Sequence, residues 1–392
     1  MVSVGLDRLV ASGFRQLRGQ RVGLLCNQAS IDANYSHILD HLTKKDSFRL
    51  AAVFGPQHGL FGHTQDNMIE WEPSEGARPY RLHSLYGEHR EPTPTMLEGL
   101  DLFVVDIPDV GARYYTFIWS MFLCMKACVA KGIPMLVLDR PNPINGTTIE
   151  GTVLQPEFAS FVGLYPLPLR HGMTVGEIAR YFKTNAYPDL TLEVVQIEGW
   201  NPSHFGDESG ATWAMPSPNM PTVDTAIVYP GGCLVEGTNL SEGRGTTRPF
   251  EIIGAPYLDG SLLAMKLNGL DLGGVRFRPV QFQPTFQKYA GQLCEGVALH
   301  VTNREAFAPV LTFVALFQEV RRLVGDAFEW KQPPYEYEFN TLPIDILAGN
   351  NWLRENIDNL SPLEDIQARF QAELKAFHPI REAALLYPRS HS

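Results

Sequence analysis

An α/β fold built on a parallel sheet is predicted by three features of the sequence. Short apolar runs recur along the first half of the chain, and helical periodicity fills the segments between them. Strands that are apolar on both faces are typical of parallel sheets covered by helices on each side. After Tyr229 the sequence changes to a Gly-rich segment followed by longer helical patterns, which indicates a second domain. We therefore expect a parallel-sheet domain over residues 1–226 and a smaller α+β domain over residues 227–392.

The expected elements follow from local patterns. A helix over 114–129 is indicated by apolar residues at helical spacing, and Gly132 supplies its stop. Thr174 and Glu177 form a capping box that predicts the start of another helix. The expected strands lie at residues 21–26, 50–54, 102–106, 135–139 and 192–195, and further helices are expected at 30–42, 309–324 and 361–377.

Composition excludes several classes of function. The net charge is −11, and an acidic chain repels phosphate backbones, so nucleic acid is a poor candidate partner. No apolar run reaches the roughly 18 residues that a membrane span needs. The five cysteines are too few and too scattered for a disulfide framework, and no export signal is visible. We therefore expect a cytoplasmic protein, with no membrane partner.

Polar side chains gather after the expected strands. Ligands of open parallel sheets bind beyond the carboxyl ends of the strands, so these residues are candidates for ligand contact. Asp and Asn also hold turns and cap helices, which is the competing structural interpretation. The candidates are Asn27, Gln57, His58, Asp106, Asp109, Arg113, Tyr114, Asp139, Arg140 and Asn142.

A second polar segment covers residues 236–250. It holds two carboxylates, Glu236 and Glu242, together with Asn239 and Arg244 in a Gly-rich loop. Such a loop can be a self-satisfied salt-bridge network, or its arginine can bind a polyhydroxylated or carboxylated ligand.

Several chemistries lack their motifs. No G-x-G-x-x-G follows the first strand, which argues against a dinucleotide despite the Rossmann-like pattern. P-loop, nucleophile-elbow and zinc-ligand spacings are also absent from the sequence. Carboxylates, histidines and arginines remain, which are the tools of acid–base hydrolysis.

Long motifs give the chain a specific resemblance. It resembles the NamZ family of exo-β-N-acetylmuramidases over about residues 20–385. The motifs are Gly55-Pro-Gln-His-Gly59, Ser84-Leu-Tyr-Gly87, Asp106-Ile-Pro-Asp-Val-Gly-Ala-Arg-Tyr-Tyr115, Leu138-Asp-Arg-Pro-Asn-Pro143, Ser160-Phe-Val-Gly163, Arg170-His-Gly-Met-Thr174, Pro216-Ser-Pro-Asn-Met-Pro-Thr222 and Glu236-Gly-Thr-Asn-Leu-Ser-Glu-Gly-Arg-Gly245.

The resemblance implies a Rossmann-like N-terminal domain and a smaller C-terminal domain, with the active site in the cleft between them. The implied reaction releases N-acetylmuramic acid (MurNAc) from the non-reducing end of peptidoglycan fragments, and no metal or organic cofactor is implied. The partner is a small sugar or muropeptide-derived substrate. His171, Asn219, Asn239 and Arg244 join the strand-end residues as expected substrate-binding groups.

One departure from the family pattern concerns the catalytic acid. The family carries Glu, the proposed acid, where this chain has Gln57, and Met68 stands where a second family Glu is expected. An amide cannot donate a proton as a carboxylic acid does. We therefore expect Glu70 to be the acid, with Glu236 or Glu242 as the next candidates and His58 as a further catalytic residue.

Two alternatives stay open. Gln57 is also consistent with a sugar-binding or regulatory protein that has lost turnover. The arginines of the 236–250 segment are consistent with a hydrolase or transferase acting on a different acidic sugar or phosphosugar.

Overall fold

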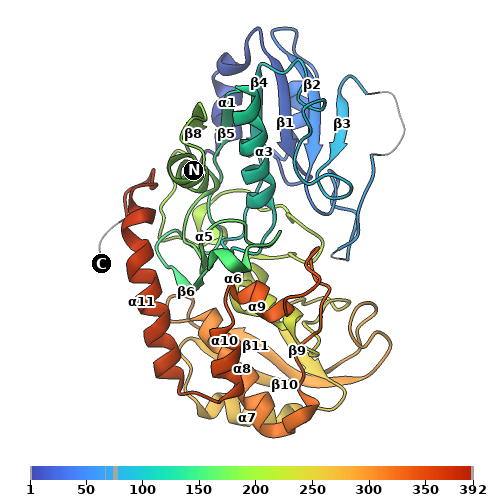
Figure 1. Cartoon of the computed structure of the whole chain (residues 1–392), viewed down its shortest axis with the longest axis vertical. Coiled ribbons are helices and arrows are strands. Elements are labelled where there is room, and N and C mark those ends of the chain that lie inside the picture. The colour runs from blue at the N-terminus through green and yellow to red at the C-terminus, as the bar shows by residue number, and fades with distance from the viewer. Residues whose placement is uncertain (1, 67, 74–77, 390–392) are drawn as a thin grey trace.

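The computed structural model describes residues 2–66, 68–73 and 78–389. A six-stranded sheet lies in the upper half of the molecule in Figure 1, confirming the predicted parallel α/β class. Every neighbouring pair of strands in that sheet is parallel, and the strand order is β3-β2-β1-β4-β5-β8. The strands are β1 (Arg21–Cys26), β2 (Arg49–Gly55), β3 (Arg81–Ser84), β4 (Leu102–Asp106), β5 (Met135–Leu138) and β8 (Leu192–Val195).

Neighbouring residues within a strand face opposite sides of this sheet. In β4, Val104 packs into one hydrophobic cluster while Phe103 and Val105 pack into another. Burial on both faces is the reason that these strands read as continuous apolar runs. The helices of this part are α1 (Gly5–Ala11), α2 (Ile38–Leu42), α3 (Phe117–Lys131) and α4 (Val175–Asn185), with the 3-10 turns η1 (Arg15–Leu17) and η2 (Pro156–Phe158).

One expectation about this region was wrong, and one strand was missed. The helix expected over 30–42 is formed only by α2, because Asp32 Oδ1 accepts hydrogen bonds from the backbone N–H groups of Asn34 and Ser36 and holds a turn there. The edge strand β3 was not predicted. Arg81 is exposed and the other three residues are half buried, and the polar Arg81 and His83 interrupt the apolar pattern.

The helix signals at α3 and α4 are confirmed. Thr174 and Glu177 form the expected reciprocal capping box at the start of α4. Gly132 ends α3 in the left-handed conformation, with φ +65°.

The second half forms a smaller α+β region, as predicted. Its antiparallel sheet has the order β10-β11-β9, from β9 (Ile252–Ala255), β10 (Val275–Phe282) and β11 (Cys294–Val301). The helices are α7 (Gly260–Gly269), α8 (Pro309–Val324), α9 (Pro343–Ala348), α10 (Trp352–Asp358) and α11 (Leu363–Glu382), with η4 (Gly325–Ala327).

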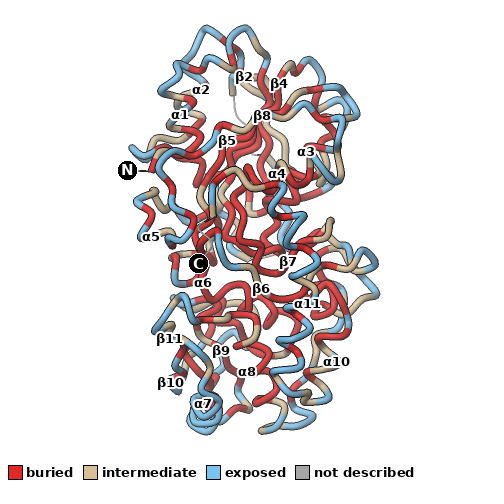
Figure 2. The backbone as a smooth tube through the Cα atoms, turned by 90° about the vertical axis from the view of Figure 1, so that its left-hand side faces the viewer, coloured by how far each residue is buried: buried red, intermediate tan, exposed pale blue. Residues whose placement is uncertain are grey.

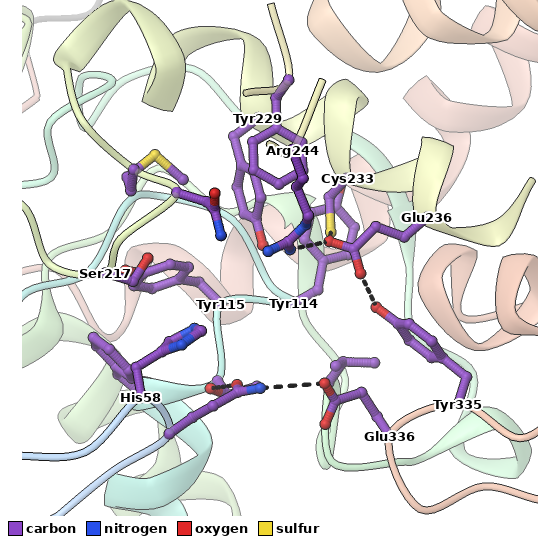
Figure 3. Close-up of a pocket in the computed structure, with 17 residues that line it drawn as sticks. His58, Tyr114, Tyr115, Ser217, Tyr229, Cys233, Glu236, Arg244, Tyr335 and Glu336 are labelled. Atoms are coloured by element: carbon purple, nitrogen blue, oxygen red, sulfur yellow. Dashed lines mark hydrogen bonds and ion pairs between the residues drawn. The ribbon is translucent and has the colours of Figure 1, made fainter. Parts of the chain in front are cut away.

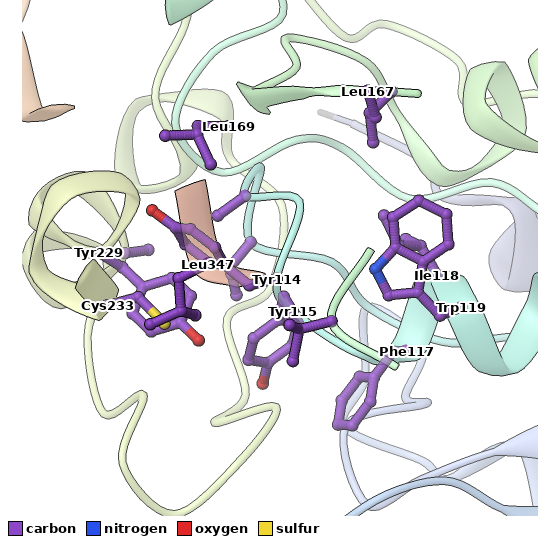
Figure 4. Close-up of a cluster of buried hydrophobic side chains, with 14 of the residues drawn as sticks. Tyr114, Tyr115, Phe117, Ile118, Trp119, Leu167, Leu169, Tyr229, Cys233 and Leu347 are labelled. Atoms are coloured by element: carbon purple, nitrogen blue, oxygen red, sulfur yellow. The ribbon is translucent and has the colours of Figure 1, made fainter. Parts of the chain in front are cut away.

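The two regions share a continuous core. The proposed division at residue 226 falls inside α6 (Val223–Gly232), which packs against α8. Helix α11 runs back along the molecule to β6 (Glu150–Val153), which pairs with β7 (Pro168–Arg170) (Figures 1 and 2). Tyr114, Tyr115 and Phe117 pack with Tyr229, Cys233 and Leu347 in one cluster (Figure 4). This shared core holds the loops of both regions in fixed positions.

Candidate active site

A pocket with a cavity volume of about 40 Å³ lies where loops of the two regions meet (Figure 3). The loop after β2 and the loop before α3 form one side. Helix α6, the 3-10 turn η3 (Cys233–Gly237) and the segment around Tyr335 form the other. We call this the inner pocket; it is lined by Gln57, His58, Tyr114, Tyr115, Thr116, Phe117, Val162, Ser217, Asn219, Met220, Tyr229, Cys233, Glu236, Arg244, Phe250, Tyr335 and Glu336.

Aromatic rings make one wall of the inner pocket. Tyr229 stands edge-to-face against Tyr114, Tyr115 and Phe250, with ring centroids 5.7, 6.0 and 4.8 Å apart. The wall therefore draws on both regions of the chain. Apolar faces with a few convergent polar groups are typical of small-molecule sites.

Glu236 is held in the ionised form on the side of the pocket that η3 and Tyr335 form. Its Oε1 accepts a hydrogen bond from Arg244 Nη2 at 2.6 Å, and its Oε2 accepts one from the Tyr335 hydroxyl at 2.7 Å. Burial alone raises the pKa of Glu236, but Arg244, Tyr335 and Lys288 outweigh it and bring the pKa below the ordinary value.

Glu242 contacts the same arginine as Glu236 and does not line the pocket itself. One of its oxygens lies 3.3 Å from Arg244 Nε, and the other accepts a hydrogen bond from Lys288 Nζ at 3.0 Å. The Arg244 charge is thus shared by two buried carboxylates. The 236–250 segment is therefore a salt-bridge network that also faces a cavity.

Glu336 is a second carboxyl group in the inner pocket. Its Oε1 accepts a hydrogen bond from Gln57 Nε2 at 3.2 Å, and its Oε2 accepts one from the Tyr86 hydroxyl at 2.9 Å. Burial, with a smaller contribution from the Glu236 charge, raises the pKa of Glu336 to about 7, although Tyr86 and Gln57 oppose the shift. The two carboxyl groups of one pocket are therefore pushed toward opposite protonation states.

His58 lies in a Gly-flanked turn with a left-handed backbone, φ +68°. Its Nδ1 is 2.7 Å from the carbonyl oxygen of Thr64, so Nδ1 carries the proton and Nε2 is an acceptor. Burial lowers the pKa of His58 to about 4. At neutral pH this imidazole is uncharged.

Two amides complete the pocket. Gln57 Oε1 accepts a hydrogen bond from the Thr116 hydroxyl at 2.6 Å, which orients its Nε2 toward Glu336. Asn219 donates through Nδ2 to the carbonyl oxygen of Gln65 at 2.7 Å.

Most of the predicted strand-end residues lie outside the inner pocket. Arg140 donates through Nε and Nη2 to Asp106 at 2.5 and 2.9 Å, and both residues are buried. Asp139 accepts hydrogen bonds from Thr174, Gly176 and the Tyr387 hydroxyl, so it ties α4 and the C-terminal segment to the sheet.

The predicted asparagines outside the pocket also bind the backbone. Asn27 donates to Pro216, Asn142 to Met173 and Asn239 to Ala327, at 3.0, 3.0 and 2.8 Å from the respective carbonyl oxygens. These contacts hold loops in place.

Asp109 and His171 form a buried pair near the same sheet edge, with Asp109 Oδ2 3.2 Å from His171 Nε2. Asp109 and Arg140 line a separate pocket of about 60 Å³, beside the reversal of strand order between β1 and β4. The 211–216 loop forms one wall of that pocket.

Arg113 and Glu70 lie apart from the inner pocket. The buried Arg113 guanidinium donates to the carbonyl oxygens of Thr152, Leu167 and Leu347 and joins three segments. Glu70 is exposed, and its Oε1 accepts a hydrogen bond from the Tyr337 hydroxyl at 3.0 Å. Of the predicted site residues, the structure gathers Gln57, His58, Tyr114, Asn219, Glu236 and Arg244 around the inner pocket, with Glu242 behind them.

Comparison with known proteins identifies the family. The model described as Exo-beta-N-acetylmuramidase NamZ, N-terminal, matches residues 22–224, and the corresponding C-terminal model matches residues 227–387. The chain belongs to the NamZ family. A curated relative, "Peptidoglycan beta-N-acetylmuramidase NamZ" of Bacillus subtilis (strain 168), is 42% identical over 98% of this chain and 91% of its own length.

Two solved structures share the NamZ-family fold. Both are DUF1343 family proteins from Bacteroides fragilis NCTC 9343. One has a TM-score of 0.89 at 29% identity and covers 99% of each chain. The other has a TM-score of 0.78 at 26% identity and covers 100% of each chain.

Glu336 was missed by the sequence analysis of this NamZ-family chain. It lies 279 residues from Gln57, and only the fold brings the two together. One signal was present: the segment Gln332-Pro-Pro-Tyr-Glu-Tyr-Glu338 alternates acidic and aromatic residues after two prolines. That pattern indicates a shaped loop rather than a solvated surface.

Neither a metal site nor a membrane span is found in residues 2–66, 68–73 and 78–389. Within those ranges no group of three or more His, Cys, Asp or Glu side chains is placed to hold a metal ion. No helix there has the length and apolar character needed to cross a membrane.

Proposed function

We propose that this chain is an exo-β-N-acetylmuramidase, a glycoside hydrolase that releases MurNAc from the non-reducing end of peptidoglycan fragments. Membership in the NamZ family and the name of the Bacillus subtilis relative support this substrate class. The same comparisons make the chain an enzyme of the hydrolase class rather than a carrier.

One observation carries the proposal: two buried carboxyl groups, Glu236 and Glu336, share a pocket with an aromatic wall. Glycoside hydrolysis requires a carboxyl group that gives a proton to the leaving oxygen and, in the two-carboxyl mechanisms, a carboxylate that acts at the anomeric carbon. An acetamido sugar can also assist its own cleavage, in which case one acid suffices.

The other pocket residues are proposed to position the sugar. His58 Nε2 is an acceptor for a sugar hydroxyl, and Asn219 contributes an amide beside it. Arg244 keeps Glu236 ionised through its 2.6 Å contact. Tyr114 presents its ring as part of the aromatic wall.

We further propose that the enzyme works in the cytoplasm, on fragments brought into the cell. All five cysteines belong to the described residues, and each is buried and free of a disulfide, which suits a reducing compartment.

The test is an assay of the purified chain on MurNAc–GlcNAc and on a chromogenic MurNAc glycoside. The matched control is the corresponding GlcNAc glycoside, which lacks the lactyl ether. Release of MurNAc from the first two substrates, with slow turnover of the third, is the expected result. Calorimetric binding of MurNAc without hydrolysis would instead identify a sugar-binding protein. Faster cleavage of another acidic sugar in a glycan panel would reassign the substrate.

A further inference from the structure

Glu336 stands between two cavities. It lines the inner pocket, and it also lines a second, outer cavity of about 420 Å³. We call the second cavity the outer groove; its other lining residues are Glu88, His89, Arg90, Glu91, Leu123, Ser160, Phe161, Leu164, Tyr337 and Glu338. A substrate that fills both cavities would place the bond between its two halves beside the Glu336 carboxyl group.

We propose that Glu336 is the general acid of this enzyme and that it protonates the glycosidic oxygen between a MurNAc unit in the inner pocket and a leaving sugar in the outer groove. This assignment rests on the proposed function. In the step, the bond between the anomeric carbon and the glycosidic oxygen breaks and its electron pair stays on that oxygen, which takes the Glu336 proton. Water then adds to the anomeric carbon, and the proton it releases restores the Glu336 carboxyl group.

The hydrogen bonds of Glu336 fit a proton donor. Gln57 and Tyr86, its two side-chain partners, are both uncharged. Among residues 2–66, 68–73 and 78–389, no cation forms an ion pair with Glu336, whereas Glu236 lies 2.6 Å from Arg244. A buried carboxyl group without a counter-ion favours its protonated form.

Burial alone does not select Glu336. Asp139 and Glu150 are buried carboxyls whose pKa is also raised to about 7 by burial. Neither of them lines the inner pocket or the outer groove. Of these three residues, Glu336 is the one that can meet a substrate.

The two carboxyl groups of the pocket are suited to different roles. Glu236 is held ionised, and the pKa of Glu336, raised to about 7, keeps a large fraction of that carboxyl protonated at neutral pH. Pairs of carboxyls whose environments push their pKa values apart mark the acid and its ionised partner in glycosidases. Both side chains reach the pocket from the same side, flanking Tyr335 (Figure 3).

The backbone around Glu336 is strained in a way that fixes its direction. Glu336 and Tyr337 both have left-handed conformations, with φ +45° and +68°, although neither is glycine. Reciprocal backbone hydrogen bonds of 2.9 Å between Tyr335 and Glu338 close the turn. Such strain gathers at functional sites, where the surrounding structure holds it.

The assignment also explains how an amide can stand at position 57. Where the family resemblance implies a glutamic acid, Gln57 donates a hydrogen bond to Glu336. The acidic proton is therefore carried by Glu336, the hydrogen-bond partner of Gln57, and not by residue 57 itself.

The outer groove has groups suited to a leaving sugar. The Arg90 guanidinium lies 3.9 Å from the centroid of the Tyr337 ring, and Phe161 packs edge-on to the same ring at 6.4 Å. Aromatic faces and a cation beside the acid form a surface for an amino sugar and for the peptide carboxylates that muropeptides carry.

The test compares two leaving groups in Glu336→Gln. A GlcNAc leaving group needs the proton, whereas a nitrophenolate leaves without one. We expect kcat/KM for MurNAc–GlcNAc to fall by about 10²-fold or more, and kcat/KM for nitrophenyl-MurNAc to fall by less than about 10-fold. Glu305→Gln makes the same substitution at an exposed residue; it is the control and should match the wild type on both substrates.

Activity of Glu336→Gln on nitrophenyl-MurNAc also shows that the variant folds. Equal loss on both substrates by a folded variant that still binds MurNAc, or no loss on either, would overturn the assignment while leaving the proposed function intact. A wild-type chain inactive on both substrates would remove the proposed function and the acid role with it.

Discussion

Buried polar side chains gather both after the strands of the parallel sheet and in the inner pocket. The two regions differ in the groups that form hydrogen bonds and ion pairs with those side chains. At the strand ends, Asp106 is neutralised by Arg140 through two contacts, and Asp139 accepts several hydrogen bonds. In the inner pocket, Glu336 is bound by neutral donors and faces a cavity. A carboxylate that is paired with an arginine inside the protein stabilises the fold. A carboxyl group that lines a cavity can act on a ligand.

Arg140→Met is the variant with the largest expected effect, and it addresses the scaffold side of this comparison. It leaves Asp106 buried without its partner, so the free energy of unfolding should fall by roughly 3–5 kcal/mol in denaturant titrations. The control is Arg8→Met, which breaks an exposed 3.7 Å ion pair with Glu198 and should cost about 0–1 kcal/mol. Equal stability losses in the two variants would remove the distinction.

Glu236→Gln addresses the pocket side. The variant keeps the shape of the side chain but removes its negative charge, so kcat on MurNAc–GlcNAc should fall by about 10²-fold or more. Tyr335→Phe removes one hydrogen bond from the same carboxylate and should cost less. An unchanged kcat in Glu236→Gln would exclude this residue from the chemistry.

Gln57→Glu tests whether residue 57 influences the pKa of Glu336. It places a second carboxyl group at the position of an amide 3.2 Å from Glu336 Oε1. Two carboxyls at that separation share a proton, so the apparent pKa of the pair rises. The alkaline limb of kcat/KM should therefore move to higher pH. An alkaline limb at the wild-type pH would show that the two groups do not interact in solution.

The smallest expected effect concerns stability and pH. Burial raises the pKa of Asp139, Glu150 and Glu336 to about 7 in the folded chain, above their ordinary values near 4. The folded state therefore binds more protons than the unfolded state between about pH 4 and pH 7, and stability falls as pH rises through this window. Glu336→Gln should make that decline shallower in urea titrations at pH 5 and pH 8. An identical decline in both proteins would contradict the raised pKa of Glu336.

The fold was largely predictable because the sheet leaves a direct mark on the sequence. Apolar runs such as residues 102–106 are typical of strands in a parallel sheet that helices cover on both faces. The expected helix over 30–42 was wrong because side-chain hydrogen bonds of Asp32 compete with a helix, and apolar periodicity does not register them.

The site was only partly predictable. Local motifs pointed to Gln57, His58, Glu236 and Arg244, which meet in the inner pocket. Arg113 looks like a ligand-binding arginine in the sequence, but its donors are taken by backbone carbonyls of distant segments. Hydrogen bonds between segments that are far apart in the sequence leave no local pattern in it.

The protonation state of Glu336 is the central claim, and the pH dependence of kcat/KM on MurNAc–GlcNAc tests it most directly. The wild type should lose activity as pH rises through about 7, where the Glu336 proton is lost. Glu336→Gln should show low activity without that limb. The same alkaline limb in both proteins would contradict the account, because the titrating acid would then be another group.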